Sequence, residues 1–387
     1  MTPRPVPRRA KPPALAPLER LVEDFVAALG DSSLADVRAL QPPPHGSLAY
    51  GASGAISVLL HHAARSSDPA ALRTARRWMR ELDATRARTL FPTPDTGERY
   101  RESSLWFGAP GIRCVRILVA LAEPRTPDAA PDAVRAIGRF VAQVSAAQVA
   151  AAPATPDTAD LILGAAGNLV AVNLLSRVVP AGALEPLADR LAAHVAASIW
   201  ADETRWSFAH GWPGMAFALL QRAQVAGRPV ADELASRLRT LASRDAPARP
   251  GFATALPYSW CNGVAGRVLL WVKAFELTGD PSFLERARRD AGRLPASPDP
   301  VNQTLCCGTA GWAYAFLALD RVDPGAGWYE RAVQLCTQVV ASGPGFEHPS
   351  GLLKGYSGVL YLASDLADAA NRGFPFVEAL PIPARPS

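Results

Sequence analysis

The chain has 387 residues, of which 49% are hydrophobic and 19% are charged. This much apolar material supplies one or two ordinary hydrophobic cores and excludes a mainly disordered protein. The net charge is only +5, from 40 basic and 35 acidic residues, and the basic residues are scattered, so we expect no nucleic-acid binding. The longest apolar runs, such as 264–272, are interrupted by Arg or too short to cross a bilayer, which predicts no membrane span.

Residues 1–17 are rich in Pro and Arg and contain neither an apolar signal core nor a small-residue cleavage site. We therefore expect a disordered tail, a single domain over residues 18–387, and a cytoplasmic protein. Five cysteines are too few for a disulfide framework in so long a chain. Free thiols are then expected to pack in the core, to bind a metal or to act as nucleophiles.

A short pattern, Gly-x-x-Gly followed by an apolar stretch, occurs seven times. The copies are Gly51–Gly54, Gly108–Gly111, Gly164–Gly167, Gly211–Gly214, Gly263–Gly266, Gly308–Gly311 and Gly355–Gly358. Their first glycines are 45 to 57 residues apart. One copy alone is a weak signal, but seven at this spacing indicate an internal repeat.

The pattern predicts two helices in each repeat. A nearly uniformly apolar helix follows each glycine pair, in chain order at 55–65, 112–122, 169–177, 215–226, 264–277, 312–319 and 359–370. Amphipathic helices are predicted between them, at 70–82, 132–146, 187–198, 232–243 and 281–292. The apolar helices suit an inner layer and the amphipathic helices an outer layer.

Seven such helix pairs form either an open solenoid or a closed, all-α, double-layered ring. An open solenoid needs polar end caps, whereas the first and last copies resemble the middle ones, so we favour the closed ring. The glycines either serve only as packing and turn devices or adopt positive φ, which lets the inner helices begin close together at one rim. Functional residues are expected at this rim.

Three of the five cysteines stand beside the repeated glycines. Cys261 lies in YSWCNGVAG, and Cys306 and Cys307 lie in LCCGTAG of the next repeat, so a closed ring places all three sulfurs on one rim. Three thiolates suit a tetrahedral zinc ion with an open fourth position, which is typical of a catalytic site. The alternatives are core packing or a vicinal disulfide between Cys306 and Cys307. Cys114 and Cys336 lie in apolar stretches and are expected to be core residues.

His210 directly precedes Gly211 in the repeat before Cys261. It is expected to face the open metal position as an acid or base, although a fourth metal ligand or a bystander remains possible. Asp160, four residues before Gly164, is expected to orient His210 or to cap a helix. The other histidines lack this register and are expected at the surface or in packing; they are His45, His61, His62, His194 and His348.

Together, the HGWPG, SWCNG and CCG elements and the closing DLADAANRGFPF resemble the lanthionine synthetase C-like cyclases over residues 47–376. The resemblance implies a seven-fold α/α toroid that holds Zn²⁺ through Cys261, Cys306 and Cys307. It also implies that His210 and Asp160 form a proton-transfer pair.

Three positions depart from the pattern of the standalone family members. These commonly have His in place of Cys307, Arg in place of Pro257, and Tyr or His in place of Asn262. A third thiolate adds negative charge, which we expect to weaken the hold on a substrate thiolate and keep it nucleophilic. The changes at Pro257 and Asn262 indicate that another group stabilises an anionic intermediate, or that the substrate differs.

The function implied is cyclisation in lanthipeptide biosynthesis. A cysteine of a dehydrated precursor peptide would add to dehydroalanine or dehydrobutyrine, giving lanthionine or methyllanthionine. No ATP, nicotinamide or phosphate-binding signature is present, and the stretch before Ser47 is too short for a dehydratase, so we expect a separate dehydratase. The alternatives are addition of an external small thiol such as glutathione, a noncatalytic toroid that presents the peptide, and another zinc toroid of the prenyltransferase type.

Overall fold

The computed structural model describes residues 16–40, 44–85, 103–122, 129–150, 154–180, 182–245, 256–299, 302–341, 349–367 and 373–382. In these ranges the regular structure is helical, apart from one isolated β-bridge between Pro375 and Ala379. The expected tail at 1–17 lies outside the described residues, except that Ala16 and Pro17 begin the first helix.

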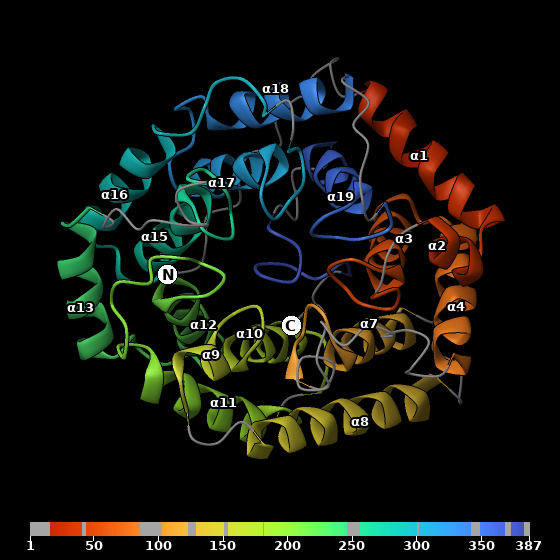
Figure 1. The fold of residues 1–387 in the computed structure, drawn as a ribbon, viewed down its shortest axis with the longest axis horizontal. Coiled ribbons are helices and arrows are strands. Elements are labelled where there is room, and N and C mark those ends of the chain that lie inside the picture. The colour runs from red at the N-terminus through yellow and green to blue at the C-terminus, as the bar shows by residue number, and fades with distance from the viewer. Residues whose placement is uncertain are drawn as a thin grey trace.

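The helices form two concentric layers around a ring (Figure 1). The inner helices are α3 (Ala52–Ser66), α7 (Ala109–Leu121), α10 (Ala165–Leu175), α12 (Trp212–Val225), α15 (Val264–Thr278), α17 (Thr309–Val322) and α19 (Tyr356–Ala367). The outer helices are α1 (Ala16–Asp31), α4 (Pro69–Ala84), α8 (Ala129–Ala150), α11 (Glu185–Ser198), α13 (Asp232–Ala242), α16 (Pro281–Ala291) and α18 (Trp328–Ala341). Two short helices, α2 (Leu34–Leu40) and α9 (Pro156–Ala159), lie in connections. The predicted double-layered ring of seven helix pairs is confirmed.

Burial separates the two layers as the sequence predicts. In α10 all eleven residues are buried, because this inner helix is surrounded on every side. The outer helix α4 buries a single stripe, which consists of Ala71, Ala75, Trp78, Met79 and Leu82. This spacing is that of one helical face against a core.

Most inner helices begin three or four residues before the predicted start, because the second glycine of each pair lies within the first turn. The expectation of positive φ at the repeated glycines is wrong: Gly263, which caps α15, has φ −103° and is extended. These positions require glycine for a different reason. A Cβ at Gly308 or Gly311 would lie under 3.0 Å from the carbonyl oxygen of the residue six positions earlier, Asn302 or Leu305.

Buried polar side chains join the two ends of the ring. Asp365 of α19 accepts hydrogen bonds from Arg65 of α3 at 2.7 Å and from Tyr314 of α17 at 2.8 Å. Its Oδ1 also lies 2.9 Å from Nε2 of His61, again on α3. The outer face of α19 is covered by α1, so the chain's first described helix completes the layer around its last inner helix.

A belt of hydrogen bonds runs around the rim where the inner helices begin. Its members stand two residues before the first glycine of each copy; they are Ala49, Trp106, Ile162, Ala209, Cys261, Cys306 and Leu353. Six of the seven links are backbone N–H to carbonyl bonds of 2.8–3.3 Å between successive repeats, including the one that closes the ring, from Leu353 to Ala49. The seventh link runs through the Ser104 hydroxyl, which donates to the carbonyl of Ile162. The belt fixes the register of neighbouring rim loops.

Among the described helices, none combines the length and the apolar character that crossing a lipid bilayer requires.

Candidate metal centre and proton-transfer pair

The rim belt brings Cys261 and Cys306 side by side. The backbone N–H of Cys261 donates to the carbonyl of Cys306 at 3.1 Å, so the two cysteines occupy equivalent places in adjacent repeats. Cys307 is the next residue along the chain and directly precedes Gly308, the N-cap of α17. Residues at the same position of adjacent repeats are therefore brought close together in space by main-chain hydrogen bonds.

The three sulfur atoms lie within 4.8 Å of one another. Sγ of Cys307 is 3.4 Å from Sγ of Cys306 and 3.6 Å from Sγ of Cys261. All three thiols are free, so the vicinal disulfide considered for Cys306 and Cys307 is not formed. All three are at most 9% exposed, yet they face one another at the rim rather than dispersing into the core.

This donor set fits zinc. Three sulfurs bound to a tetrahedral zinc ion at 2.3 Å stand about 3.8 Å apart, close to the spacing found here. Thiolates select zinc over magnesium or calcium. Within the described ranges, no other His, Cys, Asp or Glu offers a ligand atom to the group.

Lys354 supplies a positive charge to the cluster, and the sequence reasoning missed it. Its Nζ lies 2.6 Å from Sγ of Cys307. Hydrogen bonds from the Cys261 and Cys306 thiols, together with Lys354, lower the pKa of Cys307 although burial opposes the shift. Burial acts to lower the pKa of Lys354, but its interactions with Cys306 and Cys307, including the hydrogen bond to Cys307, raise the pKa, so Lys354 remains an ammonium group.

The register of the repeat could have revealed Lys354. The residue directly before the first glycine of each copy occupies the same position in its rim loop; in order these are Tyr50, Phe107, Leu163, His210, Asn262, Cys307 and Lys354. Four consecutive copies, the last four, carry polar side chains at this position, and the first three carry apolar or aromatic ones. Lys354 thus follows Cys307 around the ring as Cys307 follows Asn262.

Tyr50 completes this neighbourhood across the ring closure. Burial and the nearby Cys306 raise the pKa of Tyr50 to about 12, so its phenol stays protonated. Its ring packs against Phe107 at a centroid separation of 5.0 Å. Tyr50 therefore presents an aromatic wall and a hydroxyl donor beside the thiols.

The two departures beside Cys261 are not equivalent in the structure. Asn262 replaces the family's Tyr or His, and its Nδ2 lies 3.5 Å from Sγ of Cys261. Pro257 contributes only its carbonyl, which accepts the N–H of Val264 at 2.9 Å. The positive charge that the family places four residues before the cysteine is thus absent at Pro257, and Lys354 carries one from another repeat.

His210 and Asp160 meet at the same rim. Nδ1 of His210 lies 2.8 Å from Oδ2 of Asp160. The His210 side chain is 46% exposed, whereas that of Asp160 is 3% exposed. The backbone N–H of His210 donates to the Ser207 hydroxyl, which donates to the carbonyl of Cys261. These bonds tie the histidine loop to the cysteine loop.

Asp160 contacts His210 but does not cap a helix, since α10 has Gly164 as its N-cap and no side-chain cap hydrogen bond. While Oδ2 faces His210, Oδ1 accepts the backbone N–H groups of Leu163 at 2.5 Å and Gly164 at 3.1 Å. These bonds fix the turn that precedes α10. A carboxylate held by two main-chain donors cannot rotate freely, so Oδ2 of Asp160 is held facing Nδ1 of His210.

The other cysteines and histidines in the described ranges offer no ligand atom to the cluster. Cys114 and Cys336 are fully buried, in agreement with core packing, and burial raises the pKa of each to about 12. His61 belongs to the buried group that closes the ring, and Nε2 of His194 lies 3.2 Å from the Thr158 hydroxyl. His348 lies outside the described residues.

Comparisons with known proteins identify the fold and the family of this chain. The solved structure of nisin cyclase superposes with a TM-score of 0.67 over 91% of this chain and 95% of its own, at 15% sequence identity, which shows the toroid fold. The protein named glutathione S-transferase LANCL1 from Danio rerio is 28% identical over 194 residues, 46% of this chain. The aligned part spans about half the length of that relative, 47%.

The family described as lanthionine synthetase C-like protein matches residues 144–379, more than half of the chain. This match contains His210 and the three clustered cysteines, and the fold of nisin cyclase extends over nearly the whole ring. The chain therefore belongs to the lanthionine synthetase C-like protein family.

Proposed function

We propose that this protein is a zinc-dependent cyclase that forms thioether rings in a dehydrated precursor peptide. The observation that carries the proposal is the convergence of Cys261, Cys306 and Cys307 at the rim to which His210 is tied. A metal-binding group and an acid–base group are thus presented to one opening of the ring. Membership of the family and the shared fold with nisin cyclase support the same reaction class.

Cys261, Cys306 and Cys307 would hold the zinc ion. When bound, zinc would supply a Lewis-acid site that favours the thiolate form of an incoming cysteine. Lys354 would offset the charge of the third protein thiolate. The formal charges of three thiolates, one Zn²⁺ and one ammonium group sum to zero. The formal charges of the family's set, two thiolates, one Zn²⁺ and a neutral imidazole, also sum to zero. Lys354 would therefore restore the charge balance that Cys307 changes relative to the family's histidine.

In the reaction that these residues suit, a cysteine thiolate adds to the β-carbon of dehydroalanine or dehydrobutyrine. The new C–S bond forms as the π electrons move to the α-carbon and its carbonyl, giving an enolate. Asp160 holds Nδ1 of His210, which leaves Nε2 to deliver a proton to the α-carbon. The thiol proton is lost and the α-carbon gains one, so the product is an isomer of the substrate.

The proposal assigns the described ring to one domain, 18–387, whose substrate is a peptide dehydrated by a separate dehydratase. The aromatic side of the rim, Tyr50 with Phe107, would contact residues that flank the reacting pair.

A second candidate is the addition of an external thiol, and the relative named as a glutathione S-transferase favours it. The same zinc, lysine and histidine would act, with glutathione supplying the thiolate. The reaction then joins two molecules instead of closing a ring.

One experiment separates these functions. The protein is incubated with glutathione and a dehydrated peptide that contains cysteine, and the free thiols of the peptide are then counted by N-ethylmaleimide labelling and mass spectrometry. Cyclisation removes labelling sites without a change in peptide mass, whereas glutathione addition raises the mass by one glutathione. A zinc-loaded protein that catalyses neither reaction would favour the noncatalytic alternative and contradict the proposal.

A further inference from the structure

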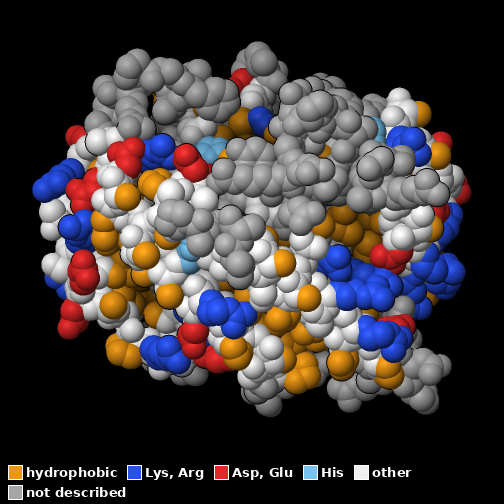
Figure 2. Space-filling model, turned by 60° about the horizontal axis from the view of Figure 1, so that its bottom comes forward, with side chains coloured by type: hydrophobic (Ala, Val, Ile, Leu, Met, Phe, Trp, Pro, Cys, Tyr) orange, Lys and Arg blue, Asp and Glu red, His pale blue; other side chains and the backbone are white. Residues whose placement is uncertain are grey.

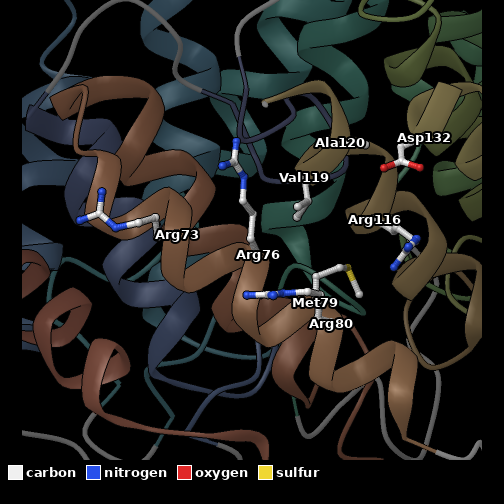
Figure 3. A pocket seen from close by; sticks show the side chains of 8 residues that line it. All are labelled: Arg73, Arg76, Met79, Arg80, Arg116, Val119, Ala120 and Asp132. Atoms are coloured by element: carbon white, nitrogen blue, oxygen red, sulfur yellow. The ribbon is translucent and has the colours of Figure 1, made fainter. Parts of the chain in front are cut away.

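A pocket of about 520 Å³ lies in the outer wall of the ring, between α4, α7 and α8 (Figure 3). Arg73, Arg76 and Arg80 of α4 line it on one side, and Arg116 of α7 and Asp132 of α8 line the other. In the space-filling view, Lys and Arg side chains gather on the right of the face shown, the side on which α4 lies (Figure 2). The pocket is separate from the cysteine cluster, since Arg116 lies in the later half of α7, away from the rim where that helix begins.

The positive charge of this pocket is only partly neutralised by the described chain. Arg116 pairs with Asp83, and Asp132 pairs with Arg135. Arg73 and Arg80 are exposed and form no hydrogen bond or ion pair with any residue in the described ranges. Two guanidinium groups therefore remain available to a ligand, beside Arg76.

The floor of the pocket is apolar. Met79 and Val119 are at most 5% exposed, and Ala120 lies beside them. Figure 3 shows Val119 between the arginines of α4 and Arg116. A ligand here would contact guanidinium groups and an apolar surface below them. A bare inorganic anion makes no favourable contact with that apolar surface.

We propose that this pocket binds an acidic segment of a polypeptide, through carboxylates on Arg73 and Arg80 and an apolar side chain on the floor. Guanidinium groups bind carboxylates in bidentate pairs. Arg73 and Arg80 are two helical turns apart, about 10 Å along the axis, so one ligand group cannot satisfy both. The volume is in the range of pockets that take organic ligands of several groups. The proposal does not depend on the chemistry of the cysteine cluster.

The test measures direct binding to the full chain by fluorescence anisotropy. The probe is a labelled peptide of Glu, Leu and Gly, compared with the same peptide in which Gln replaces Glu and with sodium tripolyphosphate as a competitor. The variant is Arg73→Glu with Arg80→Glu, and both positions are exposed, so the fold should be retained. The matched control is Arg20→Glu with Arg289→Glu, which makes the same charge change on α1 and α16.

We expect the Glu peptide to bind, the Gln peptide to bind much more weakly, and the pocket variant to lose at least about tenfold in affinity while the control is unchanged. Equal losses of affinity in the pocket variant and the control would show that binding depends only on the overall charge of the protein, and would overturn the proposal. Tripolyphosphate binding without peptide binding would overturn it in favour of a small phosphate ligand. Absence of any binding would overturn it as well.

Discussion

Nζ of Lys354 lies 2.6 Å from Sγ of Cys307, so the seventh repeat delivers a cation to a thiol of the sixth. This contact places one positive charge beside the thiol that departs from the family's histidine. One ammonium group can offset one added thiolate, so it does not also replace the positive charge that is missing at Pro257.

Replacing Lys354 with Met should weaken zinc binding about 10- to 100-fold, because the outer charge that favours the Cys307 thiolate is lost. Competition with a chromogenic chelator would measure this affinity. Lys354→Arg keeps the charge and should retain most of the affinity. Equal zinc affinity in the Met variant and the native protein would contradict the role assigned to Lys354.

Cys306→Ala should reduce the zinc content from about one ion per chain to a small fraction and abolish thiol addition, because two sulfurs remain. Atomic absorption on the dialysed protein gives the metal content. Cys336→Ala is the matched control, since that thiol is buried in α18 away from the cluster. A Cys306 variant with full zinc content would show that the metal is bound elsewhere.

Asp160→Asn should slow protonation of the enolate about 100-fold or more, because the anion that orients His210 is removed. The amide oxygen can still accept the N–H groups of Leu163 and Gly164, so the unfolding temperature and zinc content should change little. Asp160→Ala also loses the turn and should cost about 1 kcal/mol of stability in addition. A rate unaffected by Asp160→Asn would leave His210 without its positioning partner.

Gly311→Ala should destabilise the protein by more than about 1 kcal/mol, because the new Cβ would collide with the carbonyl oxygen of Leu305. Gly138→Ala provides the contrast, since no heavy atom lies within 4 Å of its Cβ position in α8. That substitution should stabilise the helix by about 0.5–1 kcal/mol. Urea unfolding of both variants measures the difference, and the same sign for both would refute the close-approach explanation.

Acidification should weaken the closure of the ring through His61. Burial lowers the pKa of His61 although Asp365 opposes the shift. Below pH about 6.5, His61 is protonated in the unfolded chain but stays neutral in the folded chain. The free energy of unfolding therefore falls as the pH falls toward the lowered pKa of the folded state. His61→Gln should flatten this part of the pH profile. An unchanged slope in that variant would assign the pH dependence to other groups.

The architecture could be predicted from the sequence because every repeat has the same pattern of buried and exposed residues. Seven glycine pairs and the contrast between inner and outer helices define the ring, and neither depends on detailed side-chain geometry. The conformation of the glycines could not be predicted, because positive φ and close main-chain approach both select glycine. Coordinates distinguish them at Gly263 and Gly308.

The candidate site was predictable to the extent that the register is shared. The positions beside the repeated glycines predict four site residues, which are Cys261, Cys306, Cys307 and His210. The position before Gly164 predicts Asp160. Lys354 occupies the same register, but a lysine beside a glycine carries no metal-binding signal of its own. Its contact with Cys307 follows from the fold, because the seventh repeat lies next to the sixth in the closed ring.

The most direct test of the proposed zinc centre is zinc K-edge X-ray absorption on the purified protein, before and after addition of a cysteine-containing dehydrated peptide. We predict three sulfur ligands at about 2.3 Å with one lighter atom, and four sulfurs once the peptide binds. Four protein ligands at the start, or a sulfur count that stays at three with bound peptide, would contradict the proposed thiolate chemistry.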